Sequence, residues 1–174
     1  MVVPTHLRRG RVVGMKTPRI YIDTSVIGGC FDAEFAPWSN GLMQDFRCGL
    51  FRPVLSEVVA VEIHPAPEPV RVQYAELLNL GAEFLVVSDE ALDLAAVYEG
   101  RGILAPRFRN DMLHIALATV ADVDIVVSWN FRHVVRFEKI RLFNAVNLEL
   151  GYKPIQIYSP REVTSYDTDG DQSS

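Results

Sequence analysis

Short apolar runs alternate along this chain with longer amphipathic stretches, and this alternation constrains the fold more than any other feature. The apolar runs are typical of buried strands, and we predict strands at 19–22, 52–56, 83–88, 124–129 and 154–159. We predict helices between them, at 38–50, 57–63, 67–81, 89–100, 110–123 and 137–151. Near-continuous apolar strands that alternate with helices indicate an α/β fold, in which helices cover a parallel sheet on both faces.

The boundaries of three of these helices carry ordinary capping signals. Ser88 precedes acidic residues and is typical of a helix N-cap, whereas Gly81 and Gly151 follow their helices as C-cap glycines. These signals support the assignment of helices at 67–81, 89–100 and 137–151.

The chain has 174 residues, of which 49% are hydrophobic and 22% charged, which suits one domain with a full core. We predict a domain at 18–163, a basic extension at 1–17 and a disordered polar tail at 164–174. Apolar runs of about 18 residues, as a membrane span requires, are missing, and the N-terminal residues do not follow the signal-peptide pattern. We therefore expect no membrane association and a cytoplasmic location. Two cysteines are too few for a disulfide framework.

The formal net charge of −5 argues against a protein that holds nucleic acid by bulk electrostatics. It does not exclude a nuclease, because a metal-dependent site concentrates acidic residues at one point.

Four polar residues from separate parts of the sequence are expected at one edge of the predicted sheet. Asp23 follows the first strand, Asn130 follows the fourth, and Asp111 lies in the first turn of the helix that leads into the fourth strand. Glu62 lies on the helix at 57–63, whose side chains tilt back toward the same edge. In open parallel sheets, sites form beyond the carboxyl ends of the strands. A shared acidic site is therefore the favoured interpretation.

Structural roles for these residues remain open at this point. Asp23 would then end a strand and Asp111 would cap a helix. Glu62 is harder to explain in this way, because it lies among valines and isoleucine, where an unpaired buried carboxylate is costly. Three other acidic residues have simpler explanations: Glu57 lies in a first helical turn, and Asp122 and Asp124 lie at the opposite edge.

Crowded carboxylates repel one another unless a divalent cation lies between them. Oxygen ligands without a histidine pair or a thiolate cluster favour Mg²⁺ or Mn²⁺ over zinc. Such ions activate water for attack on phosphorus, so hydrolysis of a phosphodiester is the reaction that this set of residues favours.

Four segments together resemble the PIN domain family, and within it the VapC-like toxins of type II toxin–antitoxin systems. They are "YIDTSVIGG", "LSEVVAVEI", "NDMLHIALA" and "VVSWNFRHV", and the resemblance spans residues 18–160. It implies a three-layer α/β/α fold with a central parallel sheet of four or five strands. It also implies a Mg²⁺- or Mn²⁺-dependent endoribonuclease that cleaves single-stranded or structured RNA.

The resemblance assigns a role to each residue of the acidic constellation. Asp23, Glu62 and Asp111 correspond to the metal ligands, and a hydroxyl of Thr24 or Ser25 supports the metal or a phosphate. Asn130 stands where many members carry a fourth acid. Because an amide brings no negative charge and cannot act as a base, we expect one firmly bound metal ion.

Two residues just after Asn130 are candidates for substrate contact. Arg132 and His133 are expected to touch the phosphate backbone, with the start of a helix as the other interpretation of His133. The resemblance further implies an RNA substrate, a cognate antitoxin and a homodimer. We expect the dimer face on the helical stretches between the second and third strands, at Tyr74, Leu77 and Leu78.

Two other functions compete with this one. A PIN-like interaction module with weak or no activity would explain the neutral Asn130. A phosphatase or phosphotransfer domain also places an aspartate after its first strand, but the phosphatase pattern needs a second aspartate where this chain has Ser25. An assay for metal-dependent cleavage of RNA distinguishes the three functions, because a phosphatase would act on monoesters and an interaction module would cleave nothing.

Overall fold

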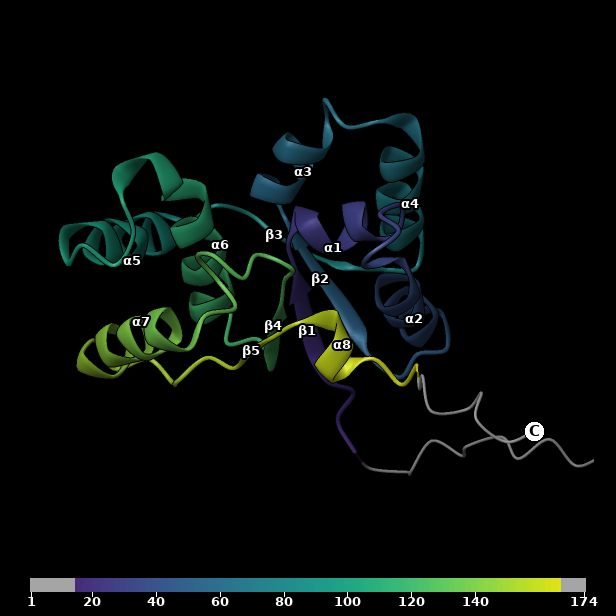
Figure 1. Ribbon diagram of the computed structural model, residues 1–174. Helices are drawn as coiled ribbons and strands as arrows, with labels where there is room; N and C mark the ends of the chain where they lie inside the picture. The colour runs from purple at the N-terminus through teal and green to yellow at the C-terminus, as the bar shows by residue number, and fades with distance from the viewer. Residues whose placement is uncertain (1–14, 167–174) are drawn as a thin grey trace, which may run out of the picture.

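The computed structural model describes residues 15–166 and is built around a five-stranded, all-parallel sheet with the strand order β3-β2-β1-β4-β5 (Figure 1). The strands are β1 (Arg19–Ile22), β2 (Arg52–Ser56), β3 (Glu83–Leu85), β4 (Ile125–Val127) and β5 (Ile157–Tyr158). The helices are α1 (Thr24–Gly29), α2 (Ala36–Arg47), α3 (Glu57–Ile63), α4 (Glu68–Asn79), α5 (Asp89–Gly100), α6 (Arg109–Val120), α7 (Phe137–Glu149) and α8 (Pro160–Val163), with a 3₁₀ turn at Pro106–Phe108.

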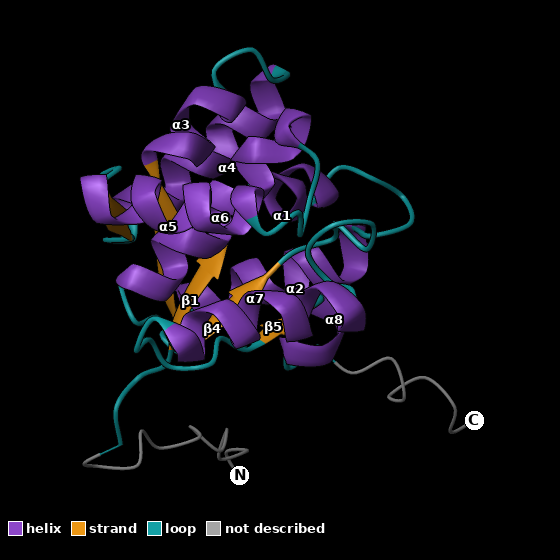
Figure 2. Ribbon diagram, turned by 90° about the vertical axis from the view of Figure 1, so that its left-hand side faces the viewer, coloured by secondary structure: helices purple, strands orange, loops and turns teal. Residues whose placement is uncertain are grey.

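Helices cover both faces of this sheet. One layer contains α5, α6 and α7, which pack on one another, and the other contains α1, α2 and α4. Figure 2 shows the strands enclosed by helices when the molecule is turned by 90°. Strand residues such as Tyr21, Ile22 and Leu55 are fully buried because both faces of the sheet are covered. The predicted three-layer α/β/α arrangement with a parallel sheet is therefore confirmed.

The predicted elements agree with the structure best at the centre of the sheet. β1, β2, α3 and α5 have the predicted bounds, and Ser88 caps α5 by accepting a hydrogen bond from the Ala91 amide at 3.2 Å. The other three strands are shorter than predicted. β3 and β5 are edge strands with a neighbour on one side only, so fewer of their residues form ladder hydrogen bonds. The short helix α1 was not predicted, because Asp23, Thr24 and Ser25 were interpreted as the end of a strand.

Charged residues pair with one another at the amino edge of the sheet. Asp122 and Asp124 lie at this edge, as the sequence predicted. Arg19, at the start of β1, makes a two-armed ion pair with Glu83 at 2.6 and 2.8 Å, and its amide donates to Asp124 at 2.7 Å. Asp122 pairs with Lys153 at 2.6 Å. Both aspartates therefore stabilise the edge opposite the predicted site.

The predicted C-terminal boundary of the domain is too early. Ser165 donates its amide to Asp45 of α2 at 2.9 Å, and the Thr164 hydroxyl does the same at 2.9 Å. The folded chain therefore continues past 163, because a buried carboxylate on α2 needs these donors. The basic extension and the remainder of the polar tail fall largely at 1–14 and 167–174, outside the described residues. Within 15–166, no helix is long and apolar enough to cross a membrane.

The predicted dimer face is wrong in one residue. Leu77 of α4 is fully buried in the core, whereas Leu78 is 40% exposed and Tyr74 is half-buried. Leu77 faces the core because α4 is amphipathic, with Val70, Gln73 and Leu77 on one face. Of these three predicted side chains, Leu78 and part of Tyr74 are exposed on the surface.

Candidate active site

Asp23 lies directly beyond the carboxyl end of β1 and caps the following helix. Its carboxylate accepts a hydrogen bond from the Ser25 amide at 3.1 Å, which satisfies an orphan donor at the start of α1. The Ser25 hydroxyl donates to Oδ1 at 2.5 Å and the Ser128 hydroxyl donates to Oδ2 at 2.5 Å. Ser128 reaches Asp23 because Ile22 pairs with Val127 in the parallel ladder, which places the two next residues side by side. Asp23 is only 7% exposed.

Glu62 reaches the same edge from α3. Thr24 donates its hydroxyl to Oε2 at 2.5 Å, and the His114 Nε2 lies 3.1 Å from Oε1. Asn110, at the start of α6, lies 3.5 Å from the same oxygen. The structure therefore brings Glu62 into contact with the residue that follows Asp23, as the sequence predicted for a shared edge.

Asp111 lies in the first turn of α6, as predicted, and its nearest polar neighbour is His133. The Nδ1 atom of His133 is 2.9 Å from Asp111 Oδ2. Asn130 accepts a hydrogen bond from the His133 amide at 3.0 Å through its side-chain oxygen. Asn130 therefore orders the turn that carries His133, and in this arrangement its oxygen is occupied by a backbone donor.

His114 is the residue that sequence reasoning did not include in the site. It is 3% exposed, and its Nδ1 lies 2.6 Å from the Tyr21 hydroxyl, which also contacts Ser56 at 2.7 Å. Its position three residues after Asp111 on a helix that is otherwise apolar was the signal for it, since residues three apart share a face. Sequence reasoning also did not include Ser128, which lies within the "VVSWN" segment.

The charges of these groups are coupled through His114. Burial disfavours protonation of His114, but its contact with Glu62 and the negative charges of Asp23, Glu62 and Asp111 outweigh burial and raise its pKa above the ordinary value. Burial likewise disfavours ionised Glu62, yet the contacts with His114 and Thr24 lower its pKa overall. The three acids thus favour the charged form of one imidazole, and Glu62 does so by direct contact.

Asp23 is the exception among the acids. Burial raises its pKa, and the opposing effects of His114 and of the Ser128 and Ser25 hydroxyls compensate only in part. A buried carboxylate with a raised pKa near other acids is typical of a functional site.

The side chains are of the type that a hard divalent cation prefers as ligands, but their positions do not suit a single bound ion. Carboxylate oxygens and hydroxyls are the ligands that Mg²⁺ and Mn²⁺ prefer. Within 15–166, however, no three Asp, Glu, His or Cys side chains are positioned to hold one metal ion. The carboxylates instead accept hydrogen bonds from Ser25, Ser128, Thr24 and the two histidines. Binding of a cation between them therefore requires some of these hydrogen bonds to be given up.

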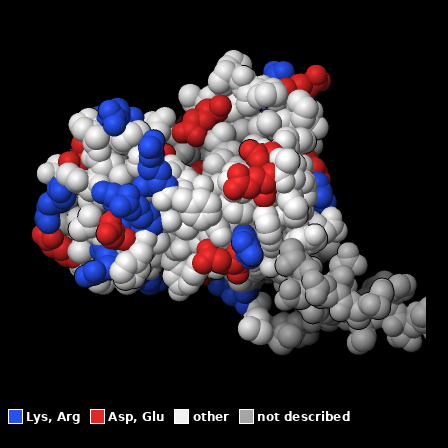
Figure 3. Space-filling view, viewed as in Figure 1, with Lys and Arg blue, Asp and Glu red and all other residues white. Residues whose placement is uncertain are grey.

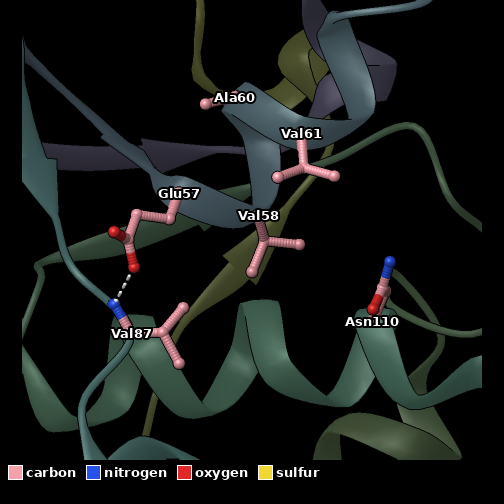
Figure 4. A pocket seen from close by; sticks show the side chains of 6 residues that line it. All are labelled: Glu57, Val58, Ala60, Val61, Val87 and Asn110. Carbon is pink, nitrogen blue, oxygen red and sulfur yellow. Dashed lines mark hydrogen bonds between the residues drawn. The ribbon is translucent and has the colours of Figure 1, made fainter.

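A hollow of about 450 Å³ lies beside Glu62, between α3 and the start of α6. In Figure 4, Val58 and Val61 of α3 face Val87 and Asn110 across it. Glu57, on its margin, accepts a hydrogen bond from the Val87 amide at 2.7 Å, which ties α3 to the segment after β3. Glu57 therefore has a structural role, in agreement with its interpretation as a residue of the first helical turn.

Two solved structures are similar to most of this chain. One is the crystal structure of VapBC2 from Rickettsia felis bound to a DNA fragment from their promoter, with 12% sequence identity and a TM-score of 0.51 over 81% of this chain and 98% of that one. The other is FitAcB from Neisseria gonorrhoeae, with 13% identity and a TM-score of 0.53 over 83% and 99%. No protein-family model and no curated protein matches the chain.

At this identity the similarity concerns the fold, and it covers nearly the full length of both known chains. Together with the strand order and the acidic edge, it confirms the fold that the four sequence segments indicated. The chain has the α/β/α fold of these two structures, as its resemblance to the PIN domain family predicted.

Proposed function

We propose that this protein is a divalent-metal-dependent endoribonuclease that hydrolyses phosphodiester bonds of RNA. One observation carries the proposal: Asp23, Glu62 and Asp111, from three separate elements, lie at the carboxyl edge of the sheet, where Glu62 contacts buried His114 on the same helix as Asp111. Clusters of this kind are rare for structural reasons alone, because burying several like charges is costly.

The chain's own residues perform three tasks in this proposal. Asp23, Glu62 and Asp111 would hold a Mg²⁺ or Mn²⁺ ion, which would supply positive charge against the scissile phosphate and lower the pKa of water. Thr24, Ser25 and Ser128 orient the carboxylates while the cation is absent. His133, which contacts Asp111 at 2.9 Å, and Arg132, which lines the same hollow as His133, would contact the phosphate backbone.

We further propose that this ribonuclease is the toxin of a toxin–antitoxin pair and acts in the cytoplasm as a homodimer. The similar structures are PIN-domain toxin–antitoxin complexes, which supports an antitoxin partner for a chain of the same fold. The dimer rests on the resemblance of the sequence to that family, with Leu78 as the exposed residue of the suggested face.

The second candidate is an interaction module without activity. It is favoured by the neutral Asn130 and by the hydrogen bonds that occupy the carboxylates where a cation would bind. A module of this kind would keep the PIN fold and bind a partner without cleaving RNA.

The deciding experiment incubates the purified protein with total cellular RNA in Mg²⁺, in Mn²⁺ or in EDTA. We expect cleavage with either metal, none in EDTA, and none for Asp23→Asn, which keeps the shape of the side chain without its charge. Asp93→Asn is the matched control, because Asp93 is an exposed residue of α5. Cleavage that persists in Asp23→Asn, or no cleavage by the unaltered protein with either metal, refutes the ribonuclease.

A further inference from the structure

A second hollow, of about 440 Å³, lies next to the acidic site and has the opposite charge. Arg107, Arg132, Arg136 and Lys139 surround it, and Phe108 and His133 lie among them. We call this hollow the basic pocket. It adjoins the acidic residues directly, because His133 lines the pocket and its Nδ1 atom is 2.9 Å from Asp111.

The positive charge of the basic pocket is largely uncompensated. None of its lining residues is acidic, although the whole chain has a net charge of −5. In the described part of the chain, Arg136 pairs with exposed Glu138 at 3.1 Å, and neither Arg107 nor Arg132 has a carboxylate within ion-pair distance. Figure 3 shows Lys and Arg side chains gathered on the side of the molecule where Figure 1 places α5, α6 and α7. Four cations on a mainly acidic protein indicate an anionic ligand.

Non-acidic contacts hold two of these cations, Arg107 and Lys139, in place. The Arg107 guanidinium lies 4.8 Å from the centre of the Phe108 ring, and Lys139 donates to the Ile103 carbonyl at 2.7 Å. The Phe108 ring packs against the His133 ring, with centroids 3.8 Å apart. The side chains are thus ordered without neutralisation of their charge, so the site is prepared for a ligand that brings the negative charge.

We propose that the basic pocket binds the phosphate backbone of an RNA strand on one side of the bond that is cleaved. The proposal rests on the ribonuclease function and deepens it by assigning the substrate-holding residues. Arginine presents a fork of donors that matches phosphate oxygens, and the pocket is larger than a single phosphate requires. A strand bound in the pocket would pass His133, whose Nδ1 atom contacts Asp111, and would therefore reach the acidic site.

The test measures binding without cleavage. A fluorescein-labelled single-stranded RNA of about 12 nucleotides is titrated with protein in EDTA, and fluorescence anisotropy gives the Kd at several salt concentrations. The double variant Arg107→Gln/Arg136→Gln removes two exposed cations of the pocket. The matched control, Arg52→Gln/Arg71→Gln, removes two exposed cations from the start of β2 and from α4.

We expect the pocket variant to bind RNA about tenfold more weakly, with the slope of log Kd against log salt reduced by roughly 1.4, as for two lost phosphate contacts. We expect the control to change Kd less than about twofold, because exposed charges away from the contact are screened. Equal weakening of both variants, or no weakening of the pocket variant, overturns the proposal. Both pairs of residues are exposed, and matching thermal unfolding curves verify that the variants fold.

Two further arms identify the ligand class. An oligo-glutamate peptide of equal charge that binds as tightly as RNA and depends on Arg107 and Arg136 overturns the RNA assignment. Competition by inorganic phosphate as strong as by RNA does the same, because it indicates a site for a small anion. Pocket-dependent RNA binding in EDTA without metal-dependent cleavage refutes the ribonuclease while leaving the RNA-binding pocket in place.

Discussion

The acidic site and the basic pocket lie side by side but are built in opposite ways. In the acidic site, the charges are buried or partly buried and compensated from within: every buried side-chain polar atom of the described residues has a hydrogen-bond partner, and buried His114 contacts Glu62. In the basic pocket the arginines are exposed and mostly unpaired. Asp111 and His133 form the contact between the two regions.

This difference separates the residues proposed for catalysis from the residues proposed for RNA binding. Buried groups are fixed in position and respond strongly to their neighbours, which suits groups that act on a cation or a proton. Exposed cations are screened and adaptable, which suits contact with a flexible polyanion. Substitutions in the first region should therefore affect the rate and stability, and substitutions in the second should affect affinity.

The largest expected effect is on the rate. Asp111→Asn should lower RNA cleavage at saturating substrate by at least about 100-fold, because the amide cannot supply charge to a cation. The Kd for RNA in EDTA should not rise. Single-turnover cleavage and anisotropy measure the two quantities. A parallel loss of rate and affinity would mean that the two regions are not separable.

The next largest effect is on stability. His114→Ala should reduce the free energy of unfolding by about 2–4 kcal/mol, since it opens a cavity and removes a hydrogen-bond partner from both the buried Tyr21 hydroxyl and Glu62. His64→Ala is the control, because His64 is exposed at the end of α3, and it should change stability by less than about 0.5 kcal/mol. Urea unfolding measures both, and similar values for the two variants would contradict the network described for His114.

The free energy of unfolding should depend on pH through the charge of His114. The pKa of His114 is raised in the folded protein, so its contribution is full below the unfolded-state pKa and is lost as pH rises through the folded-state pKa. The pKa of Glu62 is lowered, so its contribution is lost as pH falls through that value. The stability difference between the unaltered protein and His114→Gln should therefore narrow at alkaline pH. Urea unfolding across the pH range tests this, and a constant difference would show that His114 carries no charge.

The smallest expected effect concerns metal affinity. Asn130→Asp should tighten Mn²⁺ binding by roughly three- to tenfold, because it adds a negative charge beside the Asp111–His133 contact. Asn79→Asp at the exposed end of α4 is the control, with no change expected. Calorimetric titration measures both affinities. Unchanged or weaker binding in Asn130→Asp would mean that residue 130 serves only the turn that it orders.

Much of the site was predictable because parallel β/α topology determines where strand ends and helix starts lie. Asp23, Glu62 and Asp111 lie at the predicted edge for this reason. The sequence did not predict Ser128, whose contact with Asp23 depends on the register of two strands far apart in the chain. Of the basic pocket it predicted Arg132 and His133 as phosphate contacts, but not Arg107, Arg136 and Lys139, which come from the 3₁₀ turn and from the start of α7.

The sequence by itself determined the class of the fold, the central strands and the acidic edge, since apolar periodicity and chain order are local properties. Only the tertiary structure decided that His114 contacts Glu62 and Tyr21, that Leu77 is buried, and that the cations gather beside Asp111. The physical reason is that hydrogen bonds, burial and electrostatic coupling depend on distances between segments, and such distances arise when the layers pack.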